Sequence, residues 1–485
     1  MPAFALEPEH TVRCAELRAL AAERLRPIAD RGEPGRVNRP LVAELGRLGL
    51  LARLFTAGAL DLCLLRESLA YACTEAETAL ALQGLGAHPV HAHGTPAQRE
   101  RWLPRVADGS AVAAFALSEP GAGSDAAALA LRAEPVGTAA VATALRAERV
   151  GAGATASTRP TEPAGASATA ASDGGVRDGG VRGGDALGGA VPDGGTRGGD
   201  ARDGGARHGD ARHGDARGGG VRQGAVRDGA RDGGTRDGAA LAAEPDGSSG
   251  WRLTGEKCWI SNAPEADFYT VFARTTPGAG ARGVTAFLVP ADRPGLTGTA
   301  LDMISPHAIG ALGFDAVPVT ADDVLGGTDR GFRVAMDTLN LFRPSVGAFA
   351  VGMAQAALDA TVLHTARRDA FGGKLRDLQT VAHQVAEMAL RTEAARLMVY
   401  AAATAYDEGA PDIPRRAAMA KLLATETAQY VVDTAVQLHG ARALERGHLL
   451  EHLYREVRAP RVYEGASEVQ RGIIAKELYA QLEVQ

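Results

Sequence analysis

The chain lacks the features that mark exported, membrane-spanning or disulfide-rich proteins. Its 485 residues include four cysteines, none with C-x-x-C or metal-ligand spacing (Cys14, Cys63, Cys73 and Cys258). So few thiols in so long a chain exclude a disulfide scaffold. No apolar run approaches the roughly 18 residues of a membrane span, and the N-terminus lacks the basic and apolar regions of an export signal. We therefore expect a cytoplasmic protein that has neither a membrane partner nor a metal site.

The chain also lacks an excess of positive charge. Its 52 lysines and arginines are outnumbered by 58 aspartates and glutamates, which gives a net charge of −6 and a pI near 6.1. Proteins that bind nucleic acids usually carry a basic surface. No nucleic-acid partner is therefore expected.

One internal tract differs sharply in composition from the rest. From Gly174 to Gly229 every fifth residue is glycine, and arginine recurs with nearly the same period, as in "GDARHGDARGG". A folded solenoid needs a large apolar side chain at a fixed phase, where this repeat has only Val, Ala or Thr; collagen needs glycine at every third position. Arg-Gly tracts that bind RNA add aromatic residues, which this repeat lacks. The pattern predicts a disordered insertion at about residues 136–243, within one surface loop.

The flanking sequence changes its hydrophobic period twice. Residues 1–110 have apolar residues at helical spacing, as in "TVRCAELRALAAERL". Residues 111–325 contain short β-branched or aromatic runs between Gly, Pro and Asp, such as "FYTVFAR" and "GVTAFLVP". Residues 326–485 return to the helical period. These patterns predict an α+β multidomain protein with an N-terminal helical domain, a middle β domain and a C-terminal helical domain.

Four motifs then occur in a fixed order: "FALSEPGAGSD" (115–125), "LTGEKCWISNAPEADFYTVFAR" (253–274), "ARRDAFGGKLRDLQ" (366–379) and "RVYEGASEVQR" (461–471). Together they resemble the acyl-CoA dehydrogenase family of FAD-dependent flavoproteins. The resemblance covers nearly the whole chain outside the insertion. It implies a β-barrel or sandwich for the middle domain and a four-helix bundle for the C-terminal domain.

The resemblance also implies roles for individual residues. Glu464 matches the catalytic base, although a lone glutamate is by itself most often a solvated surface residue. Some relatives carry the base on an earlier helix, at a position that is Phe342 here. The expected substrate contacts are Ser124, Asn340, Arg343 and Gly465. The expected FAD contacts are Ser118, Ser124, Trp259, Ser261, Arg368, Phe371, Gln379, Gln437 and Gly440.

The sequence departs from the family pattern near both ligands. Asn340 replaces an aspartate that usually partners the arginine at position 343. Ala441 and Ala443 replace glycines of a cofactor loop, and Ala466 and Glu468 replace two contacts to the adenine end of FAD. These changes leave open a protein that keeps the fold and lacks the flavin.

The implied function is FAD-dependent α,β-desaturation of an acyl-CoA thioester, with Glu464 removing the α-proton. The resemblance implies an electron-transfer flavoprotein as acceptor and a homotetramer or homodimer as the assembly. A dehydrogenase specific for acyl-carrier-protein thioesters and an acyl-CoA oxidase use the same residues and remain alternatives. A flavin monooxygenase on this fold does not need Glu464, and a binding protein without flavin needs no base at all.

Overall fold

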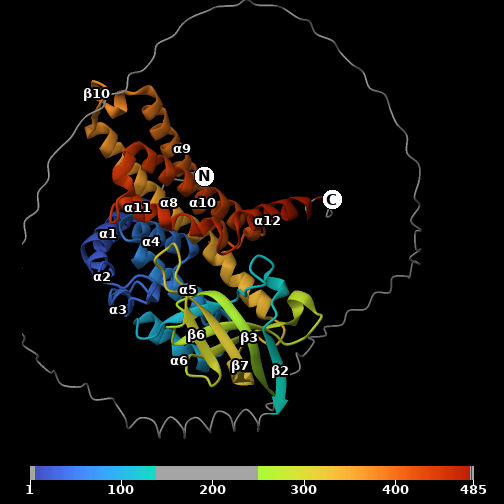
Figure 1. Cartoon of the computed structure of the whole chain (residues 1–485). Helices are drawn as coiled ribbons and strands as arrows, with labels where there is room; N and C mark the ends of the chain where they lie inside the picture. Colours follow the sequence, from blue (N-terminus) through green and yellow to red (C-terminus); the bar gives the residue numbers. More distant parts are fainter. Residues whose placement is uncertain (1–5, 138–248, 481, 483–485) are drawn as a thin grey trace, which may run out of the picture. The chain divides into compact units, whose positions relative to one another are not determined.

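The computed structural model describes residues 6–137, 249–480 and 482 (Figure 1). Helices come first, a sheet follows, and helices return, which confirms the predicted order. The predicted insertion at about 136–243 lies outside the described residues except at its start. There the prediction is wrong by two residues, because Val136 and Gly137 continue strand β2 and pair with Gly250 and Ser249 of β3.

The N-terminal helices bury their apolar faces against one another and against the sheet. Thr95 begins α6 with a reciprocal capping box, in which its hydroxyl accepts from Gln98 N at 3.2 Å. A capping box satisfies backbone donors that a helix start leaves unpaired. The helices are α1 (Pro8–Leu20), α2 (Arg26–Ala29), α3 (Arg39–Arg47), α4 (Ala59–Ala72), α5 (Thr74–His93) and α6 (Pro96–Ala107).

The middle domain is one eight-stranded sheet in the order β6-β7-β3-β2-β4-β5-β8, with β1 parallel beside β4 (Figure 1). Strands β4 and β5 are almost continuously buried, as their apolar runs predict. The strands are β1 (Ala113–Ala116), β2 (Arg132–Gly137), β3 (Ser249–Ser261), β4 (Phe268–Arg274), β5 (Val284–Pro290), β6 (Leu296–Ala300), β7 (Ile309–Thr320) and β8 (Val324–Leu325).

The C-terminal domain is built around one long helix, α8 (Gly331–Arg367). It begins against β5 and continues between α4, α9 and α10. A short hairpin follows α8, made of β9 (Asp369–Ala370) and β10 (Gly373–Lys374). The remaining helices are α9 (Gln379–Asp407), α10 (Ile413–His439), α11 (Leu449–Glu456) and α12 (Ser467–Ala480).

Among the described residues, α8 alone is long and apolar enough to cross a membrane. Its most apolar stretch is 72% buried inside the protein. Helices that form the core of a large domain are apolar all round for the same reason. We therefore assign α8 to the protein core.

The pairing of β2 with β3 leads to a prediction about the insertion. Gly137 and Ser249 are direct register partners, so a two-residue turn can join them. Replacing residues 138–248 by Asn-Gly should give a folded protein with a Tm at or above that of the full chain, because a shorter loop costs less entropy to close. Thermal unfolding of both proteins tests this. A Tm lower by many degrees contradicts it and shows that the replaced residues stabilise the fold.

Candidate active site

Glu464 lies in the segment that joins α11 to α12, in a backbone conformation that few non-glycine residues adopt. Its φ is +51° and that of Gly465 is +96°. The φ of Gly465 lies in a region that side chains rarely adopt, so the position favours glycine, and a Cβ there would also displace Gln470 Nε2, 2.3 Å away. Gln470 Nε2 donates to the carbonyl oxygens of Glu464 (3.1 Å) and Gly465 (2.9 Å). The turn that presents Glu464 is therefore fixed from α12.

Two further helices contact the same turn. From α10, Lys421 Nζ donates to the Gly465 carbonyl at 2.7 Å. From α8, Arg343 Nε donates to the Glu464 carbonyl at 3.3 Å, and its Nη1 donates to Asn340 Oδ1 at 3.4 Å. The structure thus brings together the predicted residues Glu464, Gly465, Arg343 and Asn340. Because Asn340 is neutral, it does not cancel the charge of Arg343 as an aspartate would.

The Glu464 carboxylate lies in an unusual electrostatic setting. Its Oε2 atom is buried and has no hydrogen-bond partner among the described residues. Burial raises its pKa above the usual 4.5, while Arg66, Lys421 and Arg343 act in the opposite direction. A carboxyl group shielded from water gains basicity, and neighbouring cations limit that gain. The result is a carboxylate suited to accept a proton.

Sequence analysis missed Arg66 and Lys421. Arg66 is 3% exposed within the apolar helix α4, where it pairs with Glu77 Oε1 and donates from Nη1 to Ser345 Oγ at 2.6 Å. Burial lowers the pKa of Lys421 to about 8, and Glu464 acts against that shift. The sequence does place each of these residues as a single cation within an apolar helical run. That pattern could have indicated a buried ion pair, since charged residues are rarely buried without a partner.

A second group of predicted residues lies at the sheet. Cys258 N donates to the Ser118 carbonyl at 3.0 Å, which joins the "SEPGAGSD" segment to the "CWIS" segment of β3. Trp259 has φ +58° and is 48% exposed. Ser124 is exposed and Ser261 is half-buried.

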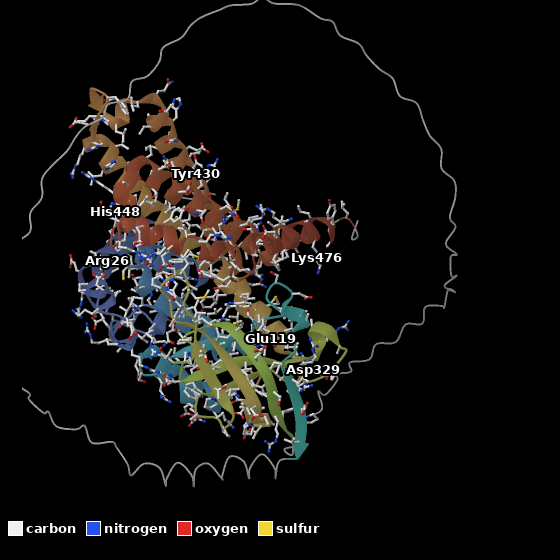
Figure 2. The ribbon with its side chains drawn as sticks, in the orientation of Figure 1. Arg26, Glu119, Asp329, Tyr430, His448 and Lys476 are labelled. Carbon is white, nitrogen blue, oxygen red and sulfur yellow. The ribbon has the colours of Figure 1, made fainter. Side chains whose placement is uncertain are left out.

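This second group is fixed by a buried ion pair. Lys257 Nζ lies 2.7 Å from Glu119 Oε1 and donates to the Leu117 carbonyl at 2.9 Å. Glu119 also accepts from the backbone of Ala130 and Leu131 at 2.5 and 3.0 Å. Figure 2 shows Glu119 at the sheet, away from the helical end labelled by Tyr430 and His448.

A third group lies at the far end of α8. Arg368 follows its last helical residue, and Phe371, in the hairpin turn, is 88% exposed with φ +55°. His364 of α8 stacks on His439 of α10 with ring centroids 4.1 Å apart. That contact places the end of α10 beside the end of α8. The exposed members of this group are Arg368, Phe371, Gln379, Gln437 and Gly440.

The first and third groups do not meet within one chain. Arg368 follows Arg343 by 25 residues, which corresponds to roughly 37 Å along an α-helix. A ligand that contacts both groups therefore needs the third group of a second chain.

The residues present fit a flavin. Gly121 and Gly123 border open space, where a Cβ would meet nothing within 4 Å. With the half-exposed Trp259, they leave room for a flat ring against the backbone. A search of the described residues finds no group of three His, Cys, Asp or Glu side chains placed to hold a metal ion.

Comparison with protein-family models gives three matches in sequence order. Residues 7–110 match the acyl-CoA dehydrogenase N-terminal domain, 232–317 the middle domain and 329–479 the C-terminal domain. The chain belongs to the acyl-CoA dehydrogenase family. Members of this family are FAD-dependent oxidoreductases that act on CH–CH bonds.

Individual relatives agree with this family. The probable acyl-CoA dehydrogenase FadE25 of Mycobacterium tuberculosis is 37% identical over 239 residues, which is 49% of this chain and 61% of that protein. The mitochondrial short-chain specific acyl-CoA dehydrogenase of Homo sapiens is 40% identical over 243 residues, which is 50% of this chain and 58% of that protein. The alignments thus span about three fifths of the length of these curated relatives.

Solved structures of acyl-CoA dehydrogenases share the fold over nearly the whole chain. Butyryl-CoA dehydrogenase from Megasphaera elsdenii superposes with a TM-score of 0.70 at 25% identity, covering 98% of this chain and 99% of that one. A glutaryl-coenzyme A dehydrogenase complex superposes with a TM-score of 0.69 at 23% identity, covering 99% and 97%. The second likeness concerns the fold alone.

The raised pKa of Glu464 predicts that its charge destabilises the fold. The protonated form of such a carboxyl group stabilises the fold. This contribution is complete below the ordinary pKa of 4.5 and is lost as pH rises through the higher pKa of the folded state. Glutamine imitates the protonated acid, so Glu464→Gln should raise Tm on the order of 2 °C at pH 7 to 8. The gain should disappear near pH 4.

Thermal unfolding across pH tests this, with Glu100→Gln as the matched control, since that side chain is exposed on α6. If Glu464→Gln is less stable than the parent at pH 8, the carboxylate makes a stabilising interaction and the electrostatic account is wrong.

Proposed function

We propose that this protein desaturates an acyl-CoA thioester between its α and β carbons, with Glu464 as the base. The observation that carries the proposal is the Glu464 carboxylate, which is held in a fixed turn with one buried oxygen that has no partner. Other described side chains also carry buried atoms without a partner, so the strained turn and the three nearby cations single Glu464 out. The proposal places the acidic C–H of a substrate against this carboxylate.

The surrounding residues support proton removal. Glu464 has a pKa raised by burial, so it binds the α-proton more strongly than a surface glutamate would. The same burial favours the uncharged acid, but Arg66, Lys421 and Arg343 act against it and help to keep the group ionised before reaction. Negative charge also develops on the thioester as the proton leaves, and these cations stabilise it.

The Glu464 backbone supplies a further interaction. Its N–H donates no hydrogen bond to a described residue, so it is free to polarise the thioester carbonyl. Gly465 lets the acyl group lie close to the backbone. When bound, FAD would supply the acceptor for the hydride that leaves the β-carbon.

The flavin site proposed here is shared between two chains. When bound, the isoalloxazine ring would be held by Trp259, Ser118 and Ser261 of one chain, with Ser124 toward the substrate. The exposed group at the far end of α8, with Arg368 foremost, binds the diphosphate of the neighbouring chain's FAD. A planar guanidinium matches a diphosphate in geometry and charge. This arrangement requires a homodimer or homotetramer.

The remaining assignments follow from this chemistry and are part of the proposal. The electrons pass to an electron-transfer flavoprotein, and the enzyme works in the cytoplasm. Reaction of the reduced protein with oxygen would identify an acyl-CoA oxidase. Preference for an acyl-carrier-protein thioester over acyl-CoA would identify a dehydrogenase specific for the carrier protein. Ala441, Ala466 and Glu468 favour weaker flavin binding, so a colourless purified protein would point to a binding function.

The base is tested by Glu464→Gln, which keeps the shape and cannot accept a proton at neutral pH. Anaerobic bleaching of the flavin by acyl-CoA should slow by about 10²–10⁴-fold, with the flavin content unchanged. Glu100→Gln should bleach at the parent rate. Equal rates for Glu464→Gln and the parent, measured with a substrate that the parent desaturates, would remove Glu464 from the mechanism.

The shared site is tested by Arg368→Ala. Loss of a charged contact should weaken FAD binding by about tenfold or more, and Tm should then depend more strongly on added FAD. Arg376→Ala is the control, because Arg376 is also exposed and lies two residues after β10. Equilibrium dialysis of FAD provides the measurement. Unchanged affinity in Arg368→Ala shows that this end of α8 does not contact the cofactor.

A further inference from the structure

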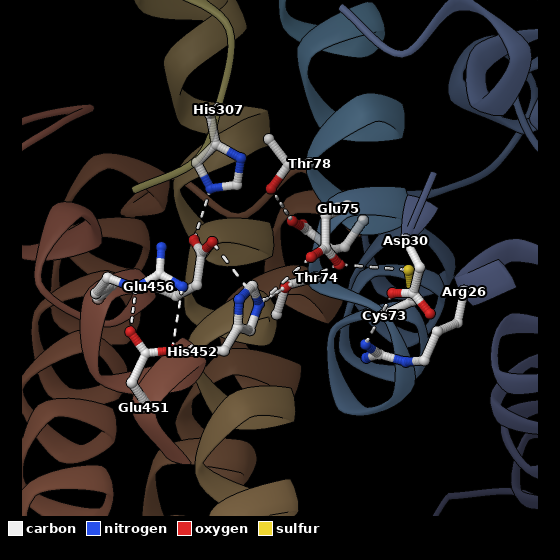
Figure 3. Close-up of polar contacts among 12 residues, drawn as sticks. Arg26, Asp30, Cys73, Thr74, Glu75, Thr78, His307, Glu451, His452 and Glu456 are labelled. Atoms are coloured by element: carbon white, nitrogen blue, oxygen red, sulfur yellow. Dashed lines mark hydrogen bonds and ion pairs between the residues drawn. The ribbon is translucent and has the colours of Figure 1, made fainter. Parts of the chain in front are cut away.

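A buried group of charged residues lies outside the site, where the three domains meet (Figure 3). The connection between β6 and β7, residues 301–308, reaches from the sheet to the end of α11. Ser305 Oγ donates to the Arg455 carbonyl at 3.2 Å, and His307 Nε2 lies 2.6 Å from Glu456 Oε2. The Pro306 carbonyl accepts from Gly35 N at 3.2 Å, which adds the N-terminal domain.

Glu456 is the last residue of α11 and is 1% exposed. Its other oxygen, Oε1, is buried without a hydrogen bond and lies 3.8 Å from His452 Nε2. His307, whose side chain is 12% exposed, thus provides the one close polar contact described for this carboxylate. A buried carboxylate is costly unless it is paired, so His307 contributes to fixing the end of α11.

Other carboxylates face the same place from α5. Glu75 Oε1 lies 3.6 Å from His452 Nε2, and Thr74 Oγ1 lies 2.5 Å from that same nitrogen. Glu77, two residues further along α5, pairs with Arg66. Burial lowers the pKa of His307, but Glu456, Glu75 and Glu77 outweigh burial, so its pKa is raised above 6.5. His307 therefore carries a proton at neutral pH more readily than an ordinary histidine.

The segment that begins at Glu456 leads directly to Glu464. After the catalytic turn it is held by Gln470 and Lys421. Before the turn it is held by Arg461, whose Nη2 lies 2.9 Å from Glu426 Oε2, and by the end of α11. Glu77 adds an electrostatic connection, because its partner Arg66 also acts on the Glu464 carboxylate.

We propose that protonated His307 is a positioning residue, which by pairing with Glu456 fixes the start of the segment that presents Glu464. This proposal rests on the role of Glu464 proposed above. His307 touches neither substrate nor flavin and acts only through the backbone of residues 456–464. Its effect is present when it is charged and lost when it is not.

Hydrogen exchange of the peptide covering 457–466 tests the proposal without turnover. At pH 6, His307→Gln should exchange about tenfold faster than the parent, because glutamine removes the charge and keeps a donor. The difference should shrink as pH rises through the folded-state pKa of His307, since the parent loses the same charge there. His383→Gln, exposed on α9, is the control and should match the parent.

A double-mutant cycle shows whether the effect belongs to the pair. Glu456→Gln should also speed exchange, and His307→Gln with Glu456→Gln should be no worse than either alone. Additive effects, equal protection at pH 6, or a difference that does not change with pH would each overturn the proposal.

Kinetics separates this proposal from that for Glu464. In the parent, the bleaching rate should decrease at alkaline pH, as His307 loses its proton. His307→Gln should not show this decrease, and KM should be unchanged. If the exchange results hold and Glu464→Gln still bleaches normally, His307 fixes the segment but Glu464 is not the base. If Glu464→Gln fails to bleach and exchange is unchanged in His307→Gln, only the positioning role is wrong.

Discussion

The site depends on the placement of one carboxylate in a turn that three helices hold. The left-handed backbone at Glu464 and Gly465 is unfavourable on its own. Hydrogen bonds from α8, α10 and α12 to the two carbonyl groups offset that cost. Because these bonds all reach the backbone, they position the side chain without using its oxygens. The carboxylate is left available for chemistry while its position is fixed.

The charges near Glu464 favour the ionised form of this half-buried acid, against the effect of burial. Arg66 is neutralised in part by Glu77, and Asn340 leaves Arg343 without an acidic partner. Lys421 also faces Glu426 and Glu468, whereas Arg343 is acted on by Glu464 alone. A family aspartate at position 340 would offset part of the charge of Arg343. The replacement therefore fits the surrounding electrostatics, and it changes the substrate contact expected at position 340.

Much of this could be predicted from the sequence, because it depends on local pattern. Hydrophobic periods located the helical and β domains, and four ordered motifs located Glu464. Arg66, Lys421 and His307 could not be found in this way, because their importance comes from residues far apart in the chain that meet only after packing. The start of the insertion was misplaced by two residues for a related reason. Val136 and Gly137 look like the start of the low-complexity tract, and only their pairing with β3 makes them strand.

The length of α8 has a consequence for how the protein can vary. This 37-residue helix begins against β5, where a Cβ on Gly331 would lie 2.5 Å from the Ala286 nitrogen. Between Arg343 and Arg368 it is unbroken, so it sets both the separation and the relative direction of the two side chains. Each residue of an α-helix turns the chain by about 100°. Losing or gaining one residue in this interval would rotate the exposed hairpin by about that angle while moving it by only about 1.5 Å. The number of residues in this stretch is therefore constrained far more tightly than their identity, and variation in length is expected to fall in the loops.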